Sequence, residues 1–183
     1  DSSANSINFR FSVPTLDDDH WTNIKEIGGG RIVGEAVHAI DLACYLFDSL
    51  PQSISANAPI DKIKNKAKDN QVFLNINFAN GAHAALQYFS EANNILSKER
   101  LEVHGGGNSY ILEDFKMLRY LEGSVDRSKT FSSGKGHKES LQVFFDYVRD
   151  KSQNPFTWEE IKAVSKAAII AQDFFNSGQH HRV

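Results

Sequence analysis

The stretch Gly28-Gly29-Gly30-Arg31-Ile32-Val33-Gly34-Glu35-Ala36-Val37-His38-Ala39-Ile40-Asp41-Leu42 decides the fold of this chain. Its three consecutive glycines allow a close bend with positive φ angles. The apolar residues after them recur at three- and four-residue steps, which predicts a helix that packs along one side. We expect this helix to begin near Gly34 and to end at about Phe47, ahead of Pro51.

Three polar residues recur at three-residue steps on the same helix, namely Glu35, His38 and Asp41. This spacing places them on adjoining turns, with the outer two on either side of His38. A carboxylate, an imidazole and a second carboxylate in this arrangement can act as a general base with its orienting partners. A helix with a polar stripe, whose glycines serve packing alone, is the alternative that the pattern leaves open.

The composition is that of an ordinary globular protein and excludes several classes. The chain has 183 residues, of which 40% are hydrophobic and 23% charged, so it predicts one domain over residues 1–183. A net charge of −3 with scattered Lys and Arg argues against nucleic-acid binding. No apolar run is long enough to cross a membrane. A single cysteine, Cys44, excludes an internal disulfide. The first residues of the chain lack the basic and apolar parts of a signal peptide, so we expect a cytoplasmic protein.

Alternating apolar residues predict the strands of a sheet. The Asn80-Gly81 pair between two of these strands predicts a hairpin with a two-residue type I′ turn. Counting back from that turn pairs Ile76 with Ala85 and Val72 with Phe89, which places apolar residues on both faces. We therefore expect another subunit or domain to cover the second face. The expected strands are 7–13, 52–58, 72–79, 82–90, 99–104, 109–114 and 117–121.

The C-terminal part predicts a loop and two helices. Residues 124–136 are rich in Ser, Gly and Lys without an apolar period, which predicts a mobile loop. A helix with apolar residues on one side is expected from residue 136 to about 151. Thr157 and Glu160 predict a capping box at the start of a last helix that runs to about Phe175.

The glycine stretch resembles the start of the long helix in the C-terminal domain of the Gfo/Idh/MocA oxidoreductases. This is the family of glucose-fructose oxidoreductase and inositol dehydrogenase. Its members typically carry three glycines followed by Asp, Gly, His and Asp at fixed spacing, and the chain matches at Gly28–Gly30, His38 and Asp41. Residues 98–105 and 112–115 provide a second match, since they are similar to a strand ending in glycine and the turn after it in the family's sheet.

Two positions depart from the usual family pattern. Gly34 stands where many members carry the catalytic Asp, and Ala36 stands where they carry Gly. The chain is similar instead to a branch with the pattern GGGR-x-x-GE-x-x-H-x-x-D. This resemblance implies that Glu35 takes over from the missing carboxylate.

The resemblance implies an α+β fold with an open, predominantly antiparallel sheet and helices packed on one face. This is the fold of C-terminal domains like that of glyceraldehyde-3-phosphate dehydrogenase. NAD or NADP would be held mainly by an N-terminal Rossmann domain, and the chain contains no G-x-G-x-x-G fingerprint of such a domain. Because Asp1 is not a start methionine and a strand follows almost at once, we expect a fragment that lacks this domain and is inactive alone.

The resemblance also implies a reaction, in which hydride passes between the cofactor and a hydroxyl or keto group of a sugar, sugar derivative or cyclitol. His38 is expected to exchange the hydroxyl proton, since imidazole titrates near neutral pH, and Glu35 is expected to tune it. We also expect a homo-oligomer formed through the open sheet face. The expected substrate-binding residues are His20, Trp21, Arg31 and Asp41.

Two other functions and one other placement remain open from the sequence. The glycine at position 34 favours a non-catalytic assembly or ligand-binding module that keeps the family fold. Asp17, Asp19 and His20 are candidate ligands of a metal-dependent hydrolase, although we expect no resident metal. Trp21 is as compatible with a core position as with the substrate pocket.

Overall fold

The computed structural model describes residues 4–14, 17, 20–21, 24–61, 66–67, 71–131 and 135–177. Its main strands are β1 Ser6–Ser12, β2 Pro51–Asn57, β5 Gln71–Phe78, β6 His83–Phe89, β7 Glu99–Gly105, β8 Asn108–Glu113, β9 Met117–Glu122 and β10 Val125–Thr130. The short strands β3 Ile60–Asp61 and β4 Lys66–Ala67 pair with each other. The helices are α1 Lys25–Gly28, the π-helix η2 Ile32–Ala36, α2 Val37–Phe47, α3 His137–Val148 and α4 Trp158–Ser177.

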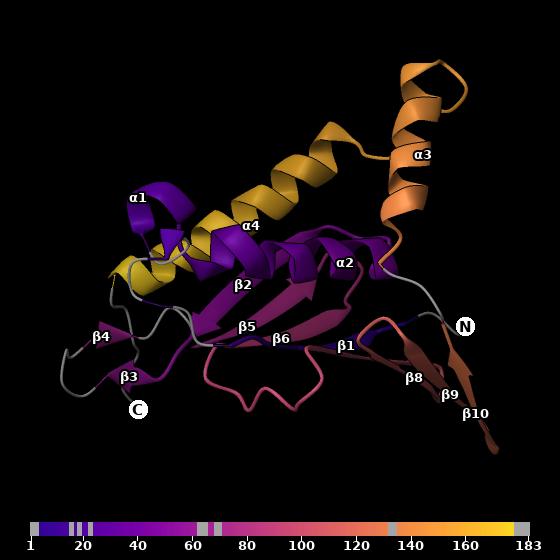
Figure 1. The fold of residues 1–183 in the computed structure, drawn as a ribbon, viewed down its shortest axis with the longest axis horizontal. Coiled ribbons are helices and arrows are strands. Elements are labelled where there is room, and N and C mark those ends of the chain that lie inside the picture. The colour runs from indigo at the N-terminus through magenta and orange to yellow at the C-terminus, as the bar shows by residue number, and fades with distance from the viewer. Residues whose placement is uncertain are drawn as a thin grey trace.

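The eight main strands form one open sheet in the order β10-β9-β8-β7-β1-β6-β5-β2. Neighbouring strands are antiparallel except β1 and β6, which run parallel. Helices α2 and α4 lie over one face of the sheet, above β2, β5 and β6, whereas β8, β9 and β10 extend beyond them (Figure 1). This arrangement confirms the predicted α+β fold with helices on one face.

The core lies between α2, α4 and the central strands. Helix α4 packs against β2, α2 and η2. Both helices present small side chains to the sheet, which lets them approach it closely. The fully buried members of this core include Ile7, Ile32, Ala39, Ile40, Ala43, Leu74, Ile76, Phe78, Ala84, Ala168 and Ala171.

The β5–β6 hairpin has a different register from the predicted one. Phe78 donates its backbone N–H to the Ala82 carbonyl over 2.9 Å, which closes a three-residue loop in which Gly81 has a φ of 86°. The side chain of Asn80 explains this choice, because its amide donates to the Phe47 carbonyl at the end of α2 over 3.1 Å. Ile76 therefore faces Ala84, one residue away from its predicted partner.

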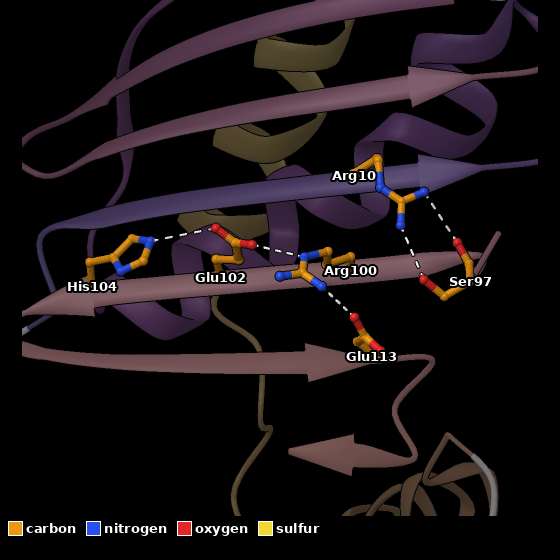
Figure 2. A network of polar contacts seen from close by, with 6 residues as sticks. All are labelled: Arg10, Ser97, Arg100, Glu102, His104 and Glu113. Atoms are coloured by element: carbon orange, nitrogen blue, oxygen red, sulfur yellow. Dashed lines mark hydrogen bonds and ion pairs between the residues drawn. The ribbon is translucent and has the colours of Figure 1, made fainter. Parts of the chain in front are cut away.

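The face of the sheet away from the helices is consequently more polar than predicted, although Phe73 and Phe89 remain on it with their ring centroids 5.4 Å apart. A one-residue change of register moves every side chain of one strand to the opposite face. Two neighbouring polar networks occupy this face (Figure 2). In one, Arg100 contacts Glu102, at 2.8 Å between Nε and Oε1, and also Glu113. In the other, Arg10 donates to the backbone and the hydroxyl of Ser97 over 3.2 and 3.1 Å.

The C-terminal part differs from the prediction at two places. Strand β10 forms within the stretch predicted to be a mobile loop, and all six of its residues are exposed. An edge strand with water on both faces needs no apolar alternation, and Arg119 on β9 holds it by donating to Asp126 over 2.8 Å between Nε and Oδ1. Helix α3 has no buried residue and stands away from the sheet (Figure 1).

The capping box at the start of α4 is confirmed. The Glu160 amide donates to the Thr157 hydroxyl over 3.1 Å, and the Thr157 amide donates to the Glu160 carboxylate over 2.7 Å. Among the described residues, no helix is long and apolar enough to cross a membrane.

Candidate active site

The glycine turn before η2 is fixed by close contact with α4. Gly29 and Gly30 have φ angles of 70° and 95°, in the left-handed region that favours glycine. A Cβ atom on Gly30 would lie 2.5 Å from Oε1 of Gln172, a side chain of α4 that is only 7% exposed. The third glycine of the run is therefore required by both its backbone angle and its packing against α4.

The helix that carries the candidate residues starts with a π turn. Val37 donates its backbone N–H to the carbonyl of Ile32, five residues earlier. Short π segments inside helices occur frequently at functional sites. The regular helix α2 begins only at Val37, whereas its end at Phe47 agrees with the prediction. Glu35 thus lies in the wider turn, and His38 lies in the regular helix.

Arg31, Glu35 and Tyr88 form one polar group beneath this helix. Arg31 is 3% exposed, and its Nη1 donates to Glu35 Oε1 over 2.9 Å and to the Tyr88 hydroxyl over 3.2 Å. Tyr88 projects from β6 and is 2% exposed, whereas the Glu35 side chain is 34% exposed. The buried arginine and tyrosine therefore hold a carboxylate whose outer part reaches solvent.

The electrostatics of this group keep the Tyr88 hydroxyl protonated. Burial raises the pKa of Tyr88 far above its ordinary value, the Glu35 carboxylate raises it further, and the Arg31 guanidinium partly opposes them. A protonated hydroxyl can accept from Arg31 and donate to Glu35 at the same time. The result is a neutral link between two opposite charges in a buried position.

His38 and Asp41 lie on the outward face of α2, where both are exposed. The pKa of Asp41 nevertheless lies above its ordinary value, mainly because its carboxyl group is partly desolvated. The nearby His38 lowers this pKa, and Glu160 of α4 raises it. The same face continues to Tyr45, which is 81% exposed. The helix therefore presents an imidazole, a carboxylate and a phenol along one open face.

The residues before the glycine turn form a separate pair. The rings of His20 and Trp21 lie 5.9 Å apart at an interplanar angle of 33°. Trp21 is 56% exposed, so the alternative of a core tryptophan is wrong. Asp17 is exposed, and Asp19 lies outside the described residues. Within the described part of the chain, no group of three or more His, Cys, Asp or Glu side chains is placed to hold a metal ion.

Two residues of this region were missed by the sequence analysis, namely Tyr88 and Gln172. Tyr88 could have been found from the buried alternation of Ala84 and Leu86 that precedes it, because a buried tyrosine hydroxyl usually needs a polar partner. The role of Gln172 carries no sequence signal, since its contact with Gly30 depends on how α4 packs.

Residues 4–111 match the family model described as the GFO/IDH/MocA C-terminal domain. The chain belongs to this family. The matched range includes the glycine turn, η2, α2 and Tyr88, so the family predicted from the glycine stretch is confirmed. A search of curated proteins found no match.

Solved oxidoreductases share the fold of this Gfo/Idh/MocA domain. UDP-N-acetylglucosamine 3-dehydrogenase from Acidithiobacillus ferrooxidans superimposes with a TM-score of 0.76 at 12% identity, over 96% of this chain and 55% of the other. Aldose-aldose oxidoreductase from Caulobacter crescentus has a TM-score of 0.76 at 13% identity, over 96% and 54%. Biliverdin reductase from Synechocystis, in complex with biliverdin and NADP+, has a TM-score of 0.74 at 16% identity, over 96% and 56%. The chain spans about half the length of these proteins.

Proposed function

We propose that this domain binds substrate and transfers the proton in an NAD(P)-dependent oxidoreductase that acts on a hydroxyl or keto group of a sugar, sugar derivative or cyclitol. The observation that carries the proposal is the open face of α2, where His38 and Asp41 are exposed beside a carboxylate held by buried partners. Two of the neighbours described above act on sugars by their names. A third binds biliverdin, so the neighbours alone do not favour a sugar. The preference for a sugar rests on the open face of α2, where His38 and Asp41 offer hydrogen-bond partners for hydroxyl groups.

The proposed reaction divides its work between this domain and a dinucleotide-binding domain. NAD or NADP, bound mainly by that other domain, accepts or returns the hydride. When the substrate is oxidised, a ring nitrogen of His38 takes the hydroxyl proton, and in the reverse direction it returns that proton. Because His38 and Asp41 are exposed, substrate and nicotinamide can reach them from outside the domain. Asp41, His20 and Trp21 would bind the substrate.

Glu35 and Arg31 have different roles in this proposal. Glu35 is partly exposed one turn before His38, so its carboxylate lies on the same side of the helix as the proposed base. It would thereby take over from the missing family aspartate. Arg31 is buried, so it would act on the substrate through Glu35, which it holds in place together with Tyr88.

The test is activity in the full-length product of the reading frame, with NADH and NADPH titrations by fluorescence. His38→Ala should lower kcat by about 10²–10⁴-fold, the usual contribution of a general acid or base. His83→Ala is the matched control, because His83 lies on the sheet and its Nδ1 is 3.0 Å from Asn77 Oδ1. Equal activity of the two variants would refute the role of His38. Failure of the full-length protein to bind either cofactor would favour a non-catalytic assembly module, which Gly34 in place of Asp also suggests.

We further propose that the protein is a cytoplasmic homo-oligomer joined through the open sheet face. A free, buried cysteine supports a reducing compartment. A hollow of about 310 Å³ lies between the two networks and is lined by Arg10, Arg100 and Glu102. Mixed charges allow this face to complement a second copy of itself across a twofold axis. Arg100→Glu should weaken the oligomer in sedimentation experiments, and a wild-type monomer at high concentration would refute the proposal.

A further inference from the structure

Helix α3 is amphipathic in sequence, and its apolar residues are only half covered by the described part of the chain. Its six apolar side chains are each between 41% and 58% exposed. A helix of 12 residues that buries none of its side chains gains little stability from packing, and such a short helix is only marginally stable in water by itself. Its apolar surface therefore needs a partner in the assembled protein. The six residues are Leu141, Val143, Phe144, Phe145, Tyr147 and Val148.

Part of this surface is hollowed into a groove, which we call the α3 groove. It has a volume of about 870 Å³ and lies between α3, the C-terminal half of α2 and the linker before α4. Lys135, Ser140 and Asn154 add polar groups to it. An apolar centre with polar groups around it is the usual composition of a protein-protein interface. The apolar lining consists of Tyr45, Val143, Phe144, Tyr147, Pro155 and Phe156.

The α3 groove is continuous with the candidate active site through Tyr45. His38, Asp41 and Tyr45 follow one another at three- and four-residue steps, so they share one face of α2. At 1.5 Å per residue, the seven steps along the helix from His38 to Tyr45 span about 10 Å. Hydride transfer requires the reacting atoms to approach to about 3–3.5 Å. The body that carries the nicotinamide must therefore stand over the same side of α2 as the groove.

We propose that the α3 groove is the docking surface for the dinucleotide-binding domain of this protein, an inference that rests on the function proposed above. The match covers only 55% of the dehydrogenase from Acidithiobacillus ferrooxidans, so nearly half of that chain is left for a further domain. Docking there fixes the distance between the nicotinamide and His38. It also gives α3 the apolar partner that the sheet does not supply.

Hydrogen exchange on the full-length protein tests the docking directly. In the wild type, the amides of α3 should exchange at least tenfold more slowly than those of the exposed turn at residues 91–97. Phe144→Asp should remove this protection and speed exchange on one surface of the dinucleotide-binding domain. The β5–β6 hairpin serves as the internal reference for intact folding. Ile95→Asp is the matched control, because Ile95 is 91% exposed and remote from the α3 groove in sequence; it should leave α3 unchanged.

Three results would overturn the docking proposal. The first is α3 exchange in the wild type as fast as that of residues 91–97. The second is protection that disappears on dilution, which would identify a second copy of the chain as the partner. The third is equal effects of Phe144→Asp and Ile95→Asp.

Cofactor titration separates this proposal from the proposed function. Phe144→Asp should bind NADH or NADPH within about twofold of the wild type while its turnover falls at least tenfold. Loss of turnover with unchanged α3 protection would contradict docking and leave the role of His38 intact. Absence of cofactor binding in the wild type would instead contradict the proposed function.

Discussion

Replacing Tyr88 by phenylalanine removes a single hydroxyl from the buried group beneath α2. In the wild type this hydroxyl accepts from Arg31 over 3.2 Å and contributes to holding Glu35. Arg31 is 3% exposed, so water cannot replace the lost oxygen without opening the core. A hydrogen bond to a charged group contributes about 1.5–3 kcal/mol, and we expect Tyr88→Phe to lower the free energy of unfolding by that amount.

Urea denaturation followed by circular dichroism measures this loss. With a denaturant slope of about 2 kcal/mol/M, a loss of about 2 kcal/mol lowers the midpoint by about 1 M. Tyr110→Phe is the matched control, because the Tyr110 hydroxyl on β8 also donates to a carboxylate, that of Glu122 at 2.7 Å, but this hydrogen bond is exposed to solvent. The control should leave the midpoint unchanged. Equal shifts for the two variants would refute the reasoning.

The pH dependence of stability provides a second measurement on the same variant. Burial first, and then Glu35, raise the pKa of Tyr88 above its ordinary value of 10.0. Above that pH the unfolded chain loses the tyrosine proton while the folded chain keeps it, so stability falls as pH rises. Tyr88→Phe lacks this group, and the difference in stability between wild type and variant should shrink above pH 10. A difference that grows with pH would contradict the raised pKa.

Three further predictions concern the packing around the site. Gly30→Ala should cost more stability than Gly29→Ala. Both substitutions impose about 1–3 kcal/mol of backbone strain, but only the one at Gly30 adds a clash with Gln172, since the nearest side-chain atom at Gly29 is 3.5 Å away. Equal melting temperatures of the two variants would contradict this. Thr157→Ala removes the cap of α4 and should cost about 1 kcal/mol in thermal unfolding, and an unchanged melting temperature would show that the cap is dispensable. Cys44 has its pKa raised to about 12, chiefly by burial, so iodoacetamide at pH 8 should modify it at least 100-fold more slowly in the folded protein than in urea; similar rates would refute its burial.

Local patterns were sufficient to predict most strands of the sheet, the end of α2 at Phe47 and the capped start of α4. The hairpin register was not predictable from Asn80-Gly81 alone, because the turn type depends on a contact between Asn80 and Phe47, 33 residues away. Strand β10 was missed for a related reason. Its stability comes from pairing with β9 and from the ion pair of Arg119 and Asp126, and neither produces an apolar alternation within the strand.

The candidate site was predictable only in part. The spacing of His38 and Asp41 correctly placed both on one face of a helix, because that depends on local geometry alone. The burial of Arg31 could not be derived, since it requires Tyr88, a residue 57 positions later on another strand. The π turn around Glu35 was likewise not predicted, because the apolar spacing of this stretch fits a regular helix; in the structure η2 packs against α4.

The central place of β1 has a consequence for synthesis on the ribosome. Strand β1 lies between β6 and β7, and its partners extend to His104. At about 5–20 residues per second, roughly 5–20 s of translation separate the end of β1 from the end of β7. Until β6 is complete at Phe89, a strand that buries Ile7 and Phe9 has neither neighbour, and it lacks β7 for the rest of the interval. Completion of the sheet around β1 is thus a late event that joins distant parts of the chain. We therefore expect slow folding and a need for protection of the nascent chain.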